Sequence, residues 1–297
     1  MTSLLSVLDV NHKKMMKLFH LTDKIKKDPS RYMLKDKCIS TVFLEPSTRT
    51  KLSFVRAMQL LNGDVLDFNP EESSLKKGED IYDTIKTICK YKIDAIIFRS
   101  PISYSAKEIA EYSHPIPVIN AGDGTNEHPT QALLDLYTIY KTFKRLKGIS
   151  IALIGDLLNH RTAHSLFLAL SNFDVKLFLV SPPKLTMPKK YFDIANDKFA
   201  LETADLEVIH KVDVVYILPF IPSKKNFYKK IGINKIPVKE YILTQNKLKD
   251  NNVIILHPFP RHGEITKDID KLPNAKYFEQ IKNGLYIRMA LLYLFLR

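Results

Sequence analysis

Short β-branched runs alternate with amphipathic stretches along the whole chain, and this alternation constrains the fold more than any other feature. In the first half, the strand-like runs are residues 37–45, 64–68, 94–98 and 117–121. The second half continues with strand-like runs at residues 150–154, 174–180, 213–218 and 252–256. A helix-like stretch follows most of these runs, and a βαβα rhythm favours parallel sheets flanked by helices. We therefore expect an α/β protein with two doubly wound parallel-sheet domains bridged by helices.

The domain boundary is expected near residues 142–148, where a helical period changes into a new strand. A chain of 297 residues is long enough for two domains of roughly 150 residues each. We expect one domain over residues 1–143 and a second over residues 144–280. A C-terminal helix over residues 281–297 is expected to complete the first domain.

Charge narrows the class of ligand. Lys+Arg number 45 against 32 Asp+Glu, a net charge of +13, which suits nucleic acid, an acidic membrane or a small phosphorylated and carboxylated substrate. The chain lacks basic stretches interleaved with aromatic residues, so a nucleic-acid partner has no support beyond the charge. The most apolar stretch, residues 285–296, contains Arg288 and is shorter than the ~20 residues of a membrane span. Charge alone does not choose among these ligands.

The two cysteines, Cys38 and Cys89, stand in no metal-binding or disulfide spacing. This pattern predicts neither a zinc site nor a disulfide framework. We expect a reduced, cytoplasmic protein.

The first loop of chemical interest runs from the strand-like run 37–45 into a helix and reads Glu45-Pro46-Ser47-Thr48-Arg49-Thr50. Such a loop presents backbone N–H groups, hydroxyls and a guanidinium to one point, which suits a phosphate. The plainer alternative is that Ser47 or Thr48 caps the helix. Arg49 favours an anion in addition, because a cation in the first turn opposes the helix dipole.

Three further loops follow strands at the same expected sheet edge, where the ligands of open α/β sheets bind. The loop at residues 73–79 is polar and basic, and by itself it indicates a solvated turn. Arg99 follows the run 94–98, and a surface salt bridge is an equal alternative to a ligand contact. His128 and Gln131 lie about one turn apart at a helix start, so both can point at one ligand.

Taken in order, these motifs resemble the catalytic chains of aspartate carbamoyltransferases, within the aspartate/ornithine transcarbamoylase family. The motifs that carry the resemblance are Ser47-Thr48-Arg49-Thr50, Arg99, His128-Pro129-Thr130-Gln131, Gly155-Asp156 with Arg161 to Ser165, and His257-Pro258-Phe259-Pro260-Arg261. The resemblance covers nearly the whole chain. The last motif is similar to the aspartate branch, because the ornithine branch typically has Cys where Pro258 stands.

The resemblance implies that residues 1–143 with 281–297 bind carbamoyl phosphate and that residues 144–280 bind the amino acid. The implied carbamoyl phosphate ligands are Ser47, Thr48, Arg49, Thr50, Arg99, His128, Gln131, Pro258, Phe259 and Pro260. The implied catalytic residues among them are Arg49, Thr50, Arg99 and His128. Donors at the carbamoyl oxygen stabilise the negative charge that develops there when an amine attacks. This chemistry requires no cofactor and no metal.

The resemblance also implies an active site shared between subunits. Ser73 and Lys77 match a loop that enters the site of a neighbouring subunit in this family, so a homotrimer is expected. Lys77 would add a cation for the phosphate and for the amino-acid carboxylate. Arg161 matches an arginine that binds a carboxylate of aspartate. A regulatory chain is possible but not evident. Residues 158–160 depart from a stretch that takes part in the change between low and high activity in regulated members, so the resemblance does not imply allosteric regulation.

The chain departs from the family after the strand-like run 213–218. Pro219 stands where the family has an aspartate-binding Arg, and Ile221 stands where it has a Gln. Neither side chain supplies a hydrogen-bond donor, although Lys224 or Lys225 offers a substitute cation. The implied reaction is transfer of the carbamoyl group from carbamoyl phosphate to the amine of L-aspartate, in de novo pyrimidine biosynthesis. The alternatives are a transcarbamoylase with a different amine acceptor and a catalytically impaired homologue.

Overall fold

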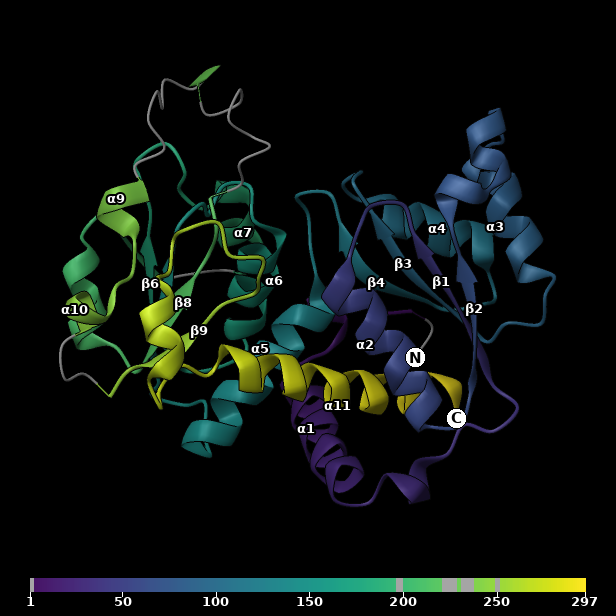
Figure 1. Cartoon of the computed structure of the whole chain (residues 1–297), viewed down its shortest axis with the longest axis horizontal. Helices are drawn as coiled ribbons and strands as arrows, with labels where there is room; N and C mark the ends of the chain where they lie inside the picture. Colours follow the sequence, from purple (N-terminus) through teal and green to yellow (C-terminus); the bar gives the residue numbers. More distant parts are fainter. Residues whose placement is uncertain (1–2, 196–199, 221–228, 231–237, 249–251) are drawn as a thin grey trace. The chain divides into compact units, whose positions relative to one another are not determined.

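The computed structural model describes residues 3–195, 200–220, 229–230, 238–248 and 252–297 (Figure 1). It divides into two compact units, one of Met1–Tyr137 with Ile281–Arg297 and one of Thr138–Gln280. Each unit is built on one parallel sheet, which confirms the predicted fold class.

The first unit contains a four-stranded parallel sheet in the order β2-β1-β3-β4. Its strands are β1 (Cys38–Phe43), β2 (Asp64–Phe68), β3 (Ala95–Ser100) and β4 (Val118–Asp123), and all four were predicted from the strand-like runs. Figure 1 shows them in the order β4, β3, β1, β2 from left to right. Because the strands are parallel, the carboxyl ends of the neighbours β1, β3 and β4 meet at one edge, and the loops that follow them are brought together.

The helices of the first unit carry apolar residues at the spacing expected for helices that pack against a sheet. They are α1 (His12–Lys27), α2 (Thr48–Leu60), α3 (Ile81–Cys89), α4 (Ser105–Ser113), α5 (Pro129–Phe143) and α11 (Tyr277–Leu296), with short 3-10 helices at Val7–Asp9, Pro29–Tyr32, Pro70–Glu72 and Ser74–Lys77. Ile85 of α3 and Ile109 of α4 share a buried cluster with Phe98 of β3. Phe19 of α1 packs on Tyr137 of α5 with ring centroids 5.5 Å apart. The unit boundaries fall within α5 and α11.

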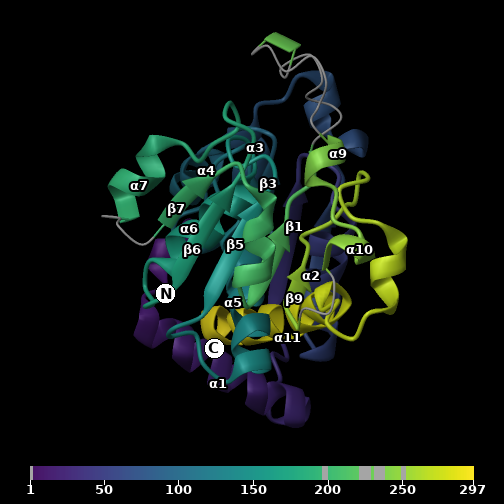
Figure 2. The ribbon, with the colours of Figure 1, turned by 90° about the vertical axis from the view of Figure 1, so that its left-hand side faces the viewer.

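The second unit contains a five-stranded parallel sheet in the order β7-β6-β5-β8-β9, and Figure 2 shows β7, β6 and β5 in succession. Its strands are β5 (Ser150–Ile154), β6 (Lys176–Val180), β7 (Ala200–Thr203), β8 (Val214–Ile217) and β9 (Ile254–Leu256). Its further helices are α6 (Arg161–Leu170), α7 (Lys189–Ala195), α9 (Val238–Tyr241) and α10 (Gln245–Leu248), with 3-10 helices at Leu206–Lys211 and Lys267–Lys271. β7 is the strand that the sequence analysis did not predict, because it is a short edge strand with exposed residues at its centre.

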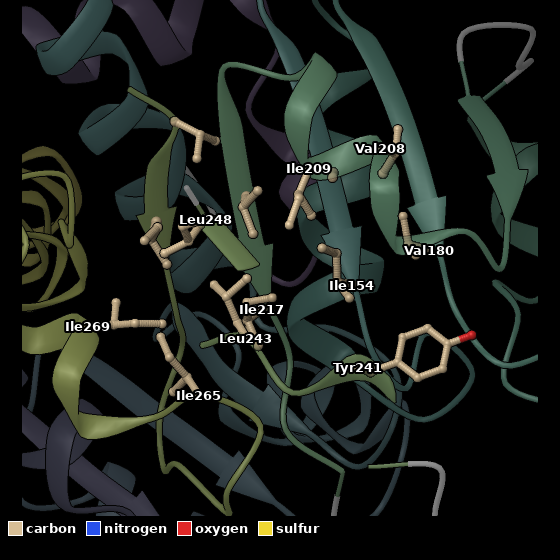
Figure 3. Close-up of a cluster of buried hydrophobic side chains, with 14 of the residues drawn as sticks. Ile154, Val180, Val208, Ile209, Ile217, Tyr241, Leu243, Leu248, Ile265 and Ile269 are labelled. Carbon is tan, nitrogen blue, oxygen red and sulfur yellow. The ribbon is translucent and has the colours of Figure 1, made fainter. Parts of the chain in front are cut away.

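A buried apolar cluster fixes the sheet of the second unit (Figure 3). Ile154 of β5 and Ile217 of β8 pack there with Val180 of β6, Leu243 and Ile269. Burying an aliphatic side chain of this size stabilises a fold by roughly 1.5–3 kcal/mol relative to exposure. The cluster therefore gives the loops at the carboxyl ends of β5, β8 and β9 a rigid base.

Helix α11 is the most apolar stretch of the chain, but it carries the buried Arg288. No helix in the described ranges has the length and hydropathy of a membrane span.

Candidate active site

The site in the first unit begins at the amino end of α2. Ser47 occupies the N-cap position, but within the described part of the chain its side chain makes no capping hydrogen bond. Thr48 is already the first helical residue, so neither hydroxyl is the cap that the plainer alternative expected. The first turn also holds no acidic residue. Uncapped N–H groups without a neighbouring carboxylate leave this helix start attractive to an anion.

Arg49 adds a cation to the same turn. Its side chain is half-buried, and burial lowers the pKa of its guanidinium. This direction shows that the surroundings disfavour the positive charge. A bound anion would offset that cost, so the position of Arg49 at this helix start is compatible with a phosphate ligand.

Thr50 and His128 connect the start of α2 to the start of α5. The Thr50 hydroxyl lies 3.3 Å from His128 Nε2, and the two residues are only 6% and 3% exposed. On the other side of the ring, His128 Nδ1 lies 3.5 Å from the Thr130 hydroxyl. The structure thus brings together two predicted motifs that lie 78 residues apart in the chain.

Arg99 lies near the carboxyl end of β3 and reaches both neighbouring strand ends. Its Nε lies 2.7 Å from Glu45 Oε1, just after β1, with side chains 14% and 23% exposed. Its Nη1 donates to the Ala121 carbonyl of β4 at 3.2 Å. The guanidinium is therefore held in place by partly buried partners, unlike an exposed surface pair. The sequence analysis gave Glu45 no role of its own, although it stands in the first loop.

Gln131 lies in the first turn of α5 and remains partly exposed. Its Nε2 donates to Asp135 Oδ1 at 2.8 Å, and Asp135 is fully buried. The sequence analysis missed Asp135, although its spacing of four residues from Gln131 places the two on one helix face.

The loop with Ser73 and Lys77 forms part of two short 3-10 helices. The Ser73 hydroxyl donates to the Pro70 carbonyl at 2.8 Å and accepts from the Leu75 N–H at 3.3 Å, so it serves its own turn. Lys77 is exposed, and no ion pair of Lys77 occurs among the residues that the structure describes. None of these contacts connects the loop to Thr50 or His128.

In the second unit, β5 leads through Gly155 and Asp156 to Arg161, the first residue of α6. Gly155 has a φ of 131°, and a Cβ added there would lie 2.5 Å from the Leu218 carbonyl oxygen, so glycine is required. Asp156 is buried and accepts the Asn159 N–H at 3.0 Å. This rigid turn fixes Arg161, which is partly exposed, close to the carboxyl end of β5.

The loop at Pro258, Phe259 and Pro260 follows β9 and is fixed by the preceding histidine. The Phe259 N–H donates to His257 Nδ1 at 2.8 Å, so Nε2 carries the proton that His257 shares with Glu264 Oε1 at 2.6 Å. Burial raises the pKa of the Glu264 carboxyl, but the hydrogen bond and the attraction of His257, together with the backbone N–H donors of Glu264 and His262, outweigh burial and hold the pKa below its ordinary value. Phe259 takes a positive φ of 55°, which aims the neighbouring backbone groups out of the usual strand direction.

Arg261 holds the same loop from its other end. It forms two hydrogen bonds to Asp270, at 2.6 and 3.2 Å, and lies 5.3 Å from the centre of the Phe259 ring. The hydrogen bond raises the pKa of the Arg261 guanidinium and lowers the pKa of the Asp270 carboxyl. The sequence analysis missed both Glu264 and Asp270, because neither stands in a motif with its partner.

Of the two residues that replace the family's aspartate ligands, the structure describes Pro219 but not Ile221. Pro219 follows β8 and is buried. Ile221, Lys224 and Lys225 lie outside the described residues.

Fold and site together define an α/β protein with two parallel-sheet units, the first of which has an uncapped helix start that carries Arg49. Two family models match the chain. Aspartate/ornithine carbamoyltransferase, carbamoyl-P binding domain, matches residues 2–141, and Aspartate/ornithine carbamoyltransferase, Asp/Orn binding domain, matches residues 147–295. The chain belongs to the aspartate/ornithine carbamoyltransferase family.

Relatives are similar over most of their length, which confirms the resemblance seen in the sequence. The aspartate carbamoyltransferase catalytic subunit of Methanosphaera stadtmanae is 43% identical over 264 residues, covering 86% of this chain and 84% of that protein. That of Vibrio campbellii is 40% identical over 301 residues, covering 99% and 96%. The crystal structure of aspartate transcarbamoylase from Trypanosoma cruzi in complex with carbamoyl phosphate and aspartate has a TM-score of 0.91 at 32% identity, covering 98% and 96%.

Proposed function

We propose that this protein is an aspartate carbamoyltransferase. It transfers the carbamoyl group of carbamoyl phosphate to the amine of L-aspartate and gives N-carbamoyl-L-aspartate and phosphate, a step of de novo pyrimidine biosynthesis. The observation that carries the proposal is the uncapped start of α2 with Arg49, joined to His128 through Thr50. The names of the relatives from Methanosphaera stadtmanae and Vibrio campbellii support it.

The start of α2 would hold the phosphate. Ser47, Thr48 and Arg49 supply two hydroxyls, backbone N–H groups and a cation within one turn. Because the phosphate gains charge as it leaves, a fixed guanidinium at this position lowers the barrier to its departure. This role accounts for an arginine in a turn where the helix dipole disfavours a cation.

Thr50, Arg99 and His128 would stabilise the carbamoyl oxygen. Attack by an amine moves negative charge onto that oxygen, and donors fixed in advance stabilise it without reorganisation. Thr50 and His128 are buried together, and Arg99 is held by Glu45. The amine attacks the carbamoyl carbon directly, so no covalent intermediate on the protein is required.

The remaining contacts to carbamoyl phosphate would come from Gln131 and from the loop Pro258, Phe259 and Pro260. Gln131 and the backbone of Pro258 and Phe259 would hold the amide. We assign residues 1–143 with 281–297 to carbamoyl phosphate and residues 144–280 to aspartate. The descriptions of the two matching family models support this division.

Arg161 and Lys77 would bind the carboxylates of aspartate. Lys77 lies in an exposed loop with Ser73, and we propose that this loop completes the site of a neighbouring subunit in a homotrimer. Lys77 is exposed, so its side chain is accessible to a neighbouring subunit, which supports the proposed shared site. Residues 158–160 give no support for a regulatory chain.

A transcarbamoylase with another amine acceptor is not favoured. The curated relatives carry the aspartate name, and the Trypanosoma cruzi structure holds aspartate beside carbamoyl phosphate. The replacements Pro219 and Ile221 would then affect the affinity for aspartate and not the identity of the amine acceptor.

We also propose a reducing, cytoplasmic setting. Cys38 and Cys89 are both free thiols, and structural disulfides belong mainly to oxidising compartments.

An acceptor panel tests the proposal. The full-length protein is incubated with a fixed concentration of carbamoyl phosphate and with L-aspartate, L-ornithine or another primary amine, and both the carbamoylated product and phosphate are measured. We expect N-carbamoyl-L-aspartate and phosphate in equal amounts. Faster formation of citrulline from L-ornithine would overturn the proposal.

A further inference from the structure

Gln131 of the proposed carbamoyl phosphate site is hydrogen-bonded to the buried Asp135, whose charge attracts the buried Arg288 of the same unit. Gln131 is partly exposed in the first turn of α5. Asp135, one turn further along the helix, is 0% exposed, and Arg288 of α11 is 4% exposed. The mechanism above uses only the first of these three residues.

Asp135 determines which end of the Gln131 amide faces the site. The Gln131 Nε2 donates to Asp135 Oδ1 at 2.8 Å. An ionised carboxylate only accepts hydrogen bonds, so the amide NH2 group must be the end that faces Asp135. The Gln131 Oε1 is then directed away from Asp135. A glutamine whose amide can rotate offers a substrate either its N–H donors or its Oε1 acceptor. Gln131, with its NH2 group held by Asp135, offers the Oε1 acceptor.

Arg288 compensates the buried charge of Asp135. Removing a carboxylate from water disfavours its charged form unless an opposite charge lies nearby. Burial lowers the pKa of Arg288 to about 10, and the attraction of Asp135 acts in the opposite direction. The guanidinium therefore stays charged at neutral pH. The attraction is mutual, so the positive charge of Arg288 partly offsets the cost of burying the Asp135 carboxylate.

The surroundings of Arg288 are shaped to hold its guanidinium. The group lies 5.2 Å from the centre of the Phe54 ring. Gly284 stands one turn earlier on α11, and a Cβ added there would lie 2.7 Å from Arg288 Nη1. Within the described chain Arg288 Nε has no hydrogen-bond partner. Its position thus fits a charge that acts through attraction to Asp135 and contact with an aromatic ring.

We propose that Asp135 is a positioning residue that, through its hydrogen bond from Nε2, fixes Gln131 as a hydrogen-bond acceptor and so selects a substrate with an N–H donor. This inference rests on the proposed function. Carbamoyl phosphate carries an NH2 group, whereas acetyl phosphate carries a methyl group at the same place. The Gln131 acceptor gains a hydrogen bond from the first and leaves a polar atom unsatisfied with the second.

The test measures the affinities of the full-length protein for carbamoyl phosphate and for acetyl phosphate. An asparagine at position 135 both donates and accepts hydrogen bonds, so either the Nε2 or the Oε1 end of the Gln131 amide can face it. We expect Asp135→Asn to lower the preference for carbamoyl phosphate about tenfold, as for one charge-assisted hydrogen bond. In a Gln131→Ala background, the same substitution should leave the preference unchanged, because its effect passes through Gln131.

Asp23→Asn is the matched control. Asp23 accepts the Tyr137 hydroxyl at 2.7 Å elsewhere in the same unit, so its replacement also removes a charged hydrogen-bond partner. We expect this variant to keep the wild-type preference.

Two results would overturn the inference. One is an equal loss of affinity for both phosphates in Asp135→Asn, and the other is a change in preference that persists in the Gln131→Ala background. If Asp135→Asn does not fold, the pair Asp135→Asn with Arg288→Met removes both buried charges together, and it should show the same loss of preference. Failure of the proposed function looks different, because the wild-type protein would then form no N-carbamoyl-L-aspartate.

Discussion

The Thr50 hydroxyl lies 3.3 Å from His128 Nε2, and this contact joins the loops after β1 and β4 into one site. Either loop alone offers an ordinary helix start. Together with Arg99 at the carboxyl end of β3, they place the Thr50 hydroxyl, the His128 ring and a cation at the edge where three neighbouring parallel strands end.

Replacing Thr50 by valine tests the donor at this contact. Thr50→Val removes the hydroxyl while keeping the branched shape, so the buried position is still filled. The loss of one donor to a developing oxyanion typically costs about a hundredfold or more in rate, and we expect kcat to fall by that order. The measurement is the steady-state rate of N-carbamoyl-L-aspartate formation.

Thr50→Ser is the control for this prediction. Serine keeps the hydroxyl and loses only the methyl group, so it should retain most of the activity. Equal activities of the valine and serine variants would remove Thr50 from the reaction.

A second prediction concerns acid stability and Glu264. The pKa of Glu264 in the folded protein lies below its ordinary value of 4.5, so the unfolded chain binds the proton more readily. The charged carboxylate therefore stabilises the fold fully above pH 4.5, and this contribution is lost as pH falls through the lowered pKa. Glu264→Gln should destabilise the protein at pH 7 by about 1–3 kcal/mol.

Thermal unfolding midpoints at several pH values measure this difference. We expect the gap between wild type and Glu264→Gln to narrow as pH falls below 4.5. Glu279→Gln is the matched control, since Glu279 is exposed and, among the described residues, its ion pair is the weak one with Lys276 at 3.5 Å. A gap that stays constant from pH 7 to acid would show that the Glu264 charge is not involved.

The third prediction addresses the residues that replace the family's aspartate ligands. Pro219→Arg with Ile221→Gln restores two side-chain donors that the chain lacks. Because one charged hydrogen bond contributes ~1.5–3 kcal/mol, the KM for L-aspartate should fall about ten- to a hundredfold. Unchanged KM values in Lys224→Ala and Lys225→Ala would show that neither lysine acts as a substitute. If the double variant keeps full activity and an unchanged KM for L-aspartate, other residues bind the aspartate carboxylates.

The fourth prediction tests the shared site. Arg49→Ala and Lys77→Ala chains are each expected to be nearly inactive. If Lys77 completes the site of a neighbouring subunit, mixed trimers of the two chains contain some sites with both native residues, and activity should return on mixing. Mixing Arg49→Ala with Thr50→Val chains is the control, since both changes affect the same chain's loop and leave every site impaired. No recovery with the Lys77→Ala chain would place Lys77 in its own subunit's site or outside the reaction.

Most strands could be predicted because parallel strands buried on both faces consist of nearly continuous β-branched and apolar residues. β3 and β5 are examples, with almost every residue buried. β7 was missed because Leu201 and Glu202 at its centre are exposed, so its sequence has no apolar run. Its place beside β6 is fixed by backbone pairing, which the sequence does not display.

Candidate site residues could be proposed from the sequence where one loop supplies its own chemistry, but not where a residue acts through a distant partner. The Ser47–Thr50 loop carries hydroxyls and a guanidinium in four consecutive residues. Glu264 and Asp270, by contrast, matter only because folding brings them to His257 and Arg261. Such pairs depend on tertiary packing, and single-sequence spacing does not reveal them.

The central claim is that the start of α2 holds the phosphate of carbamoyl phosphate. The most direct measurement compares the rate of N-carbamoyl-L-aspartate formation in wild type, Arg49→Ala and Arg56→Ala. Arg56 lies on the same helix and is exposed, and within the part of the chain that the structure describes its hydrogen bond is a long one of 3.5 Å to Gln59. We predict that Arg49→Ala lowers kcat by about a hundredfold or more, equivalent to about 3 kcal/mol, while Arg56→Ala stays close to wild type. Wild-type activity in Arg49→Ala, or an equal loss in both variants, would contradict the account.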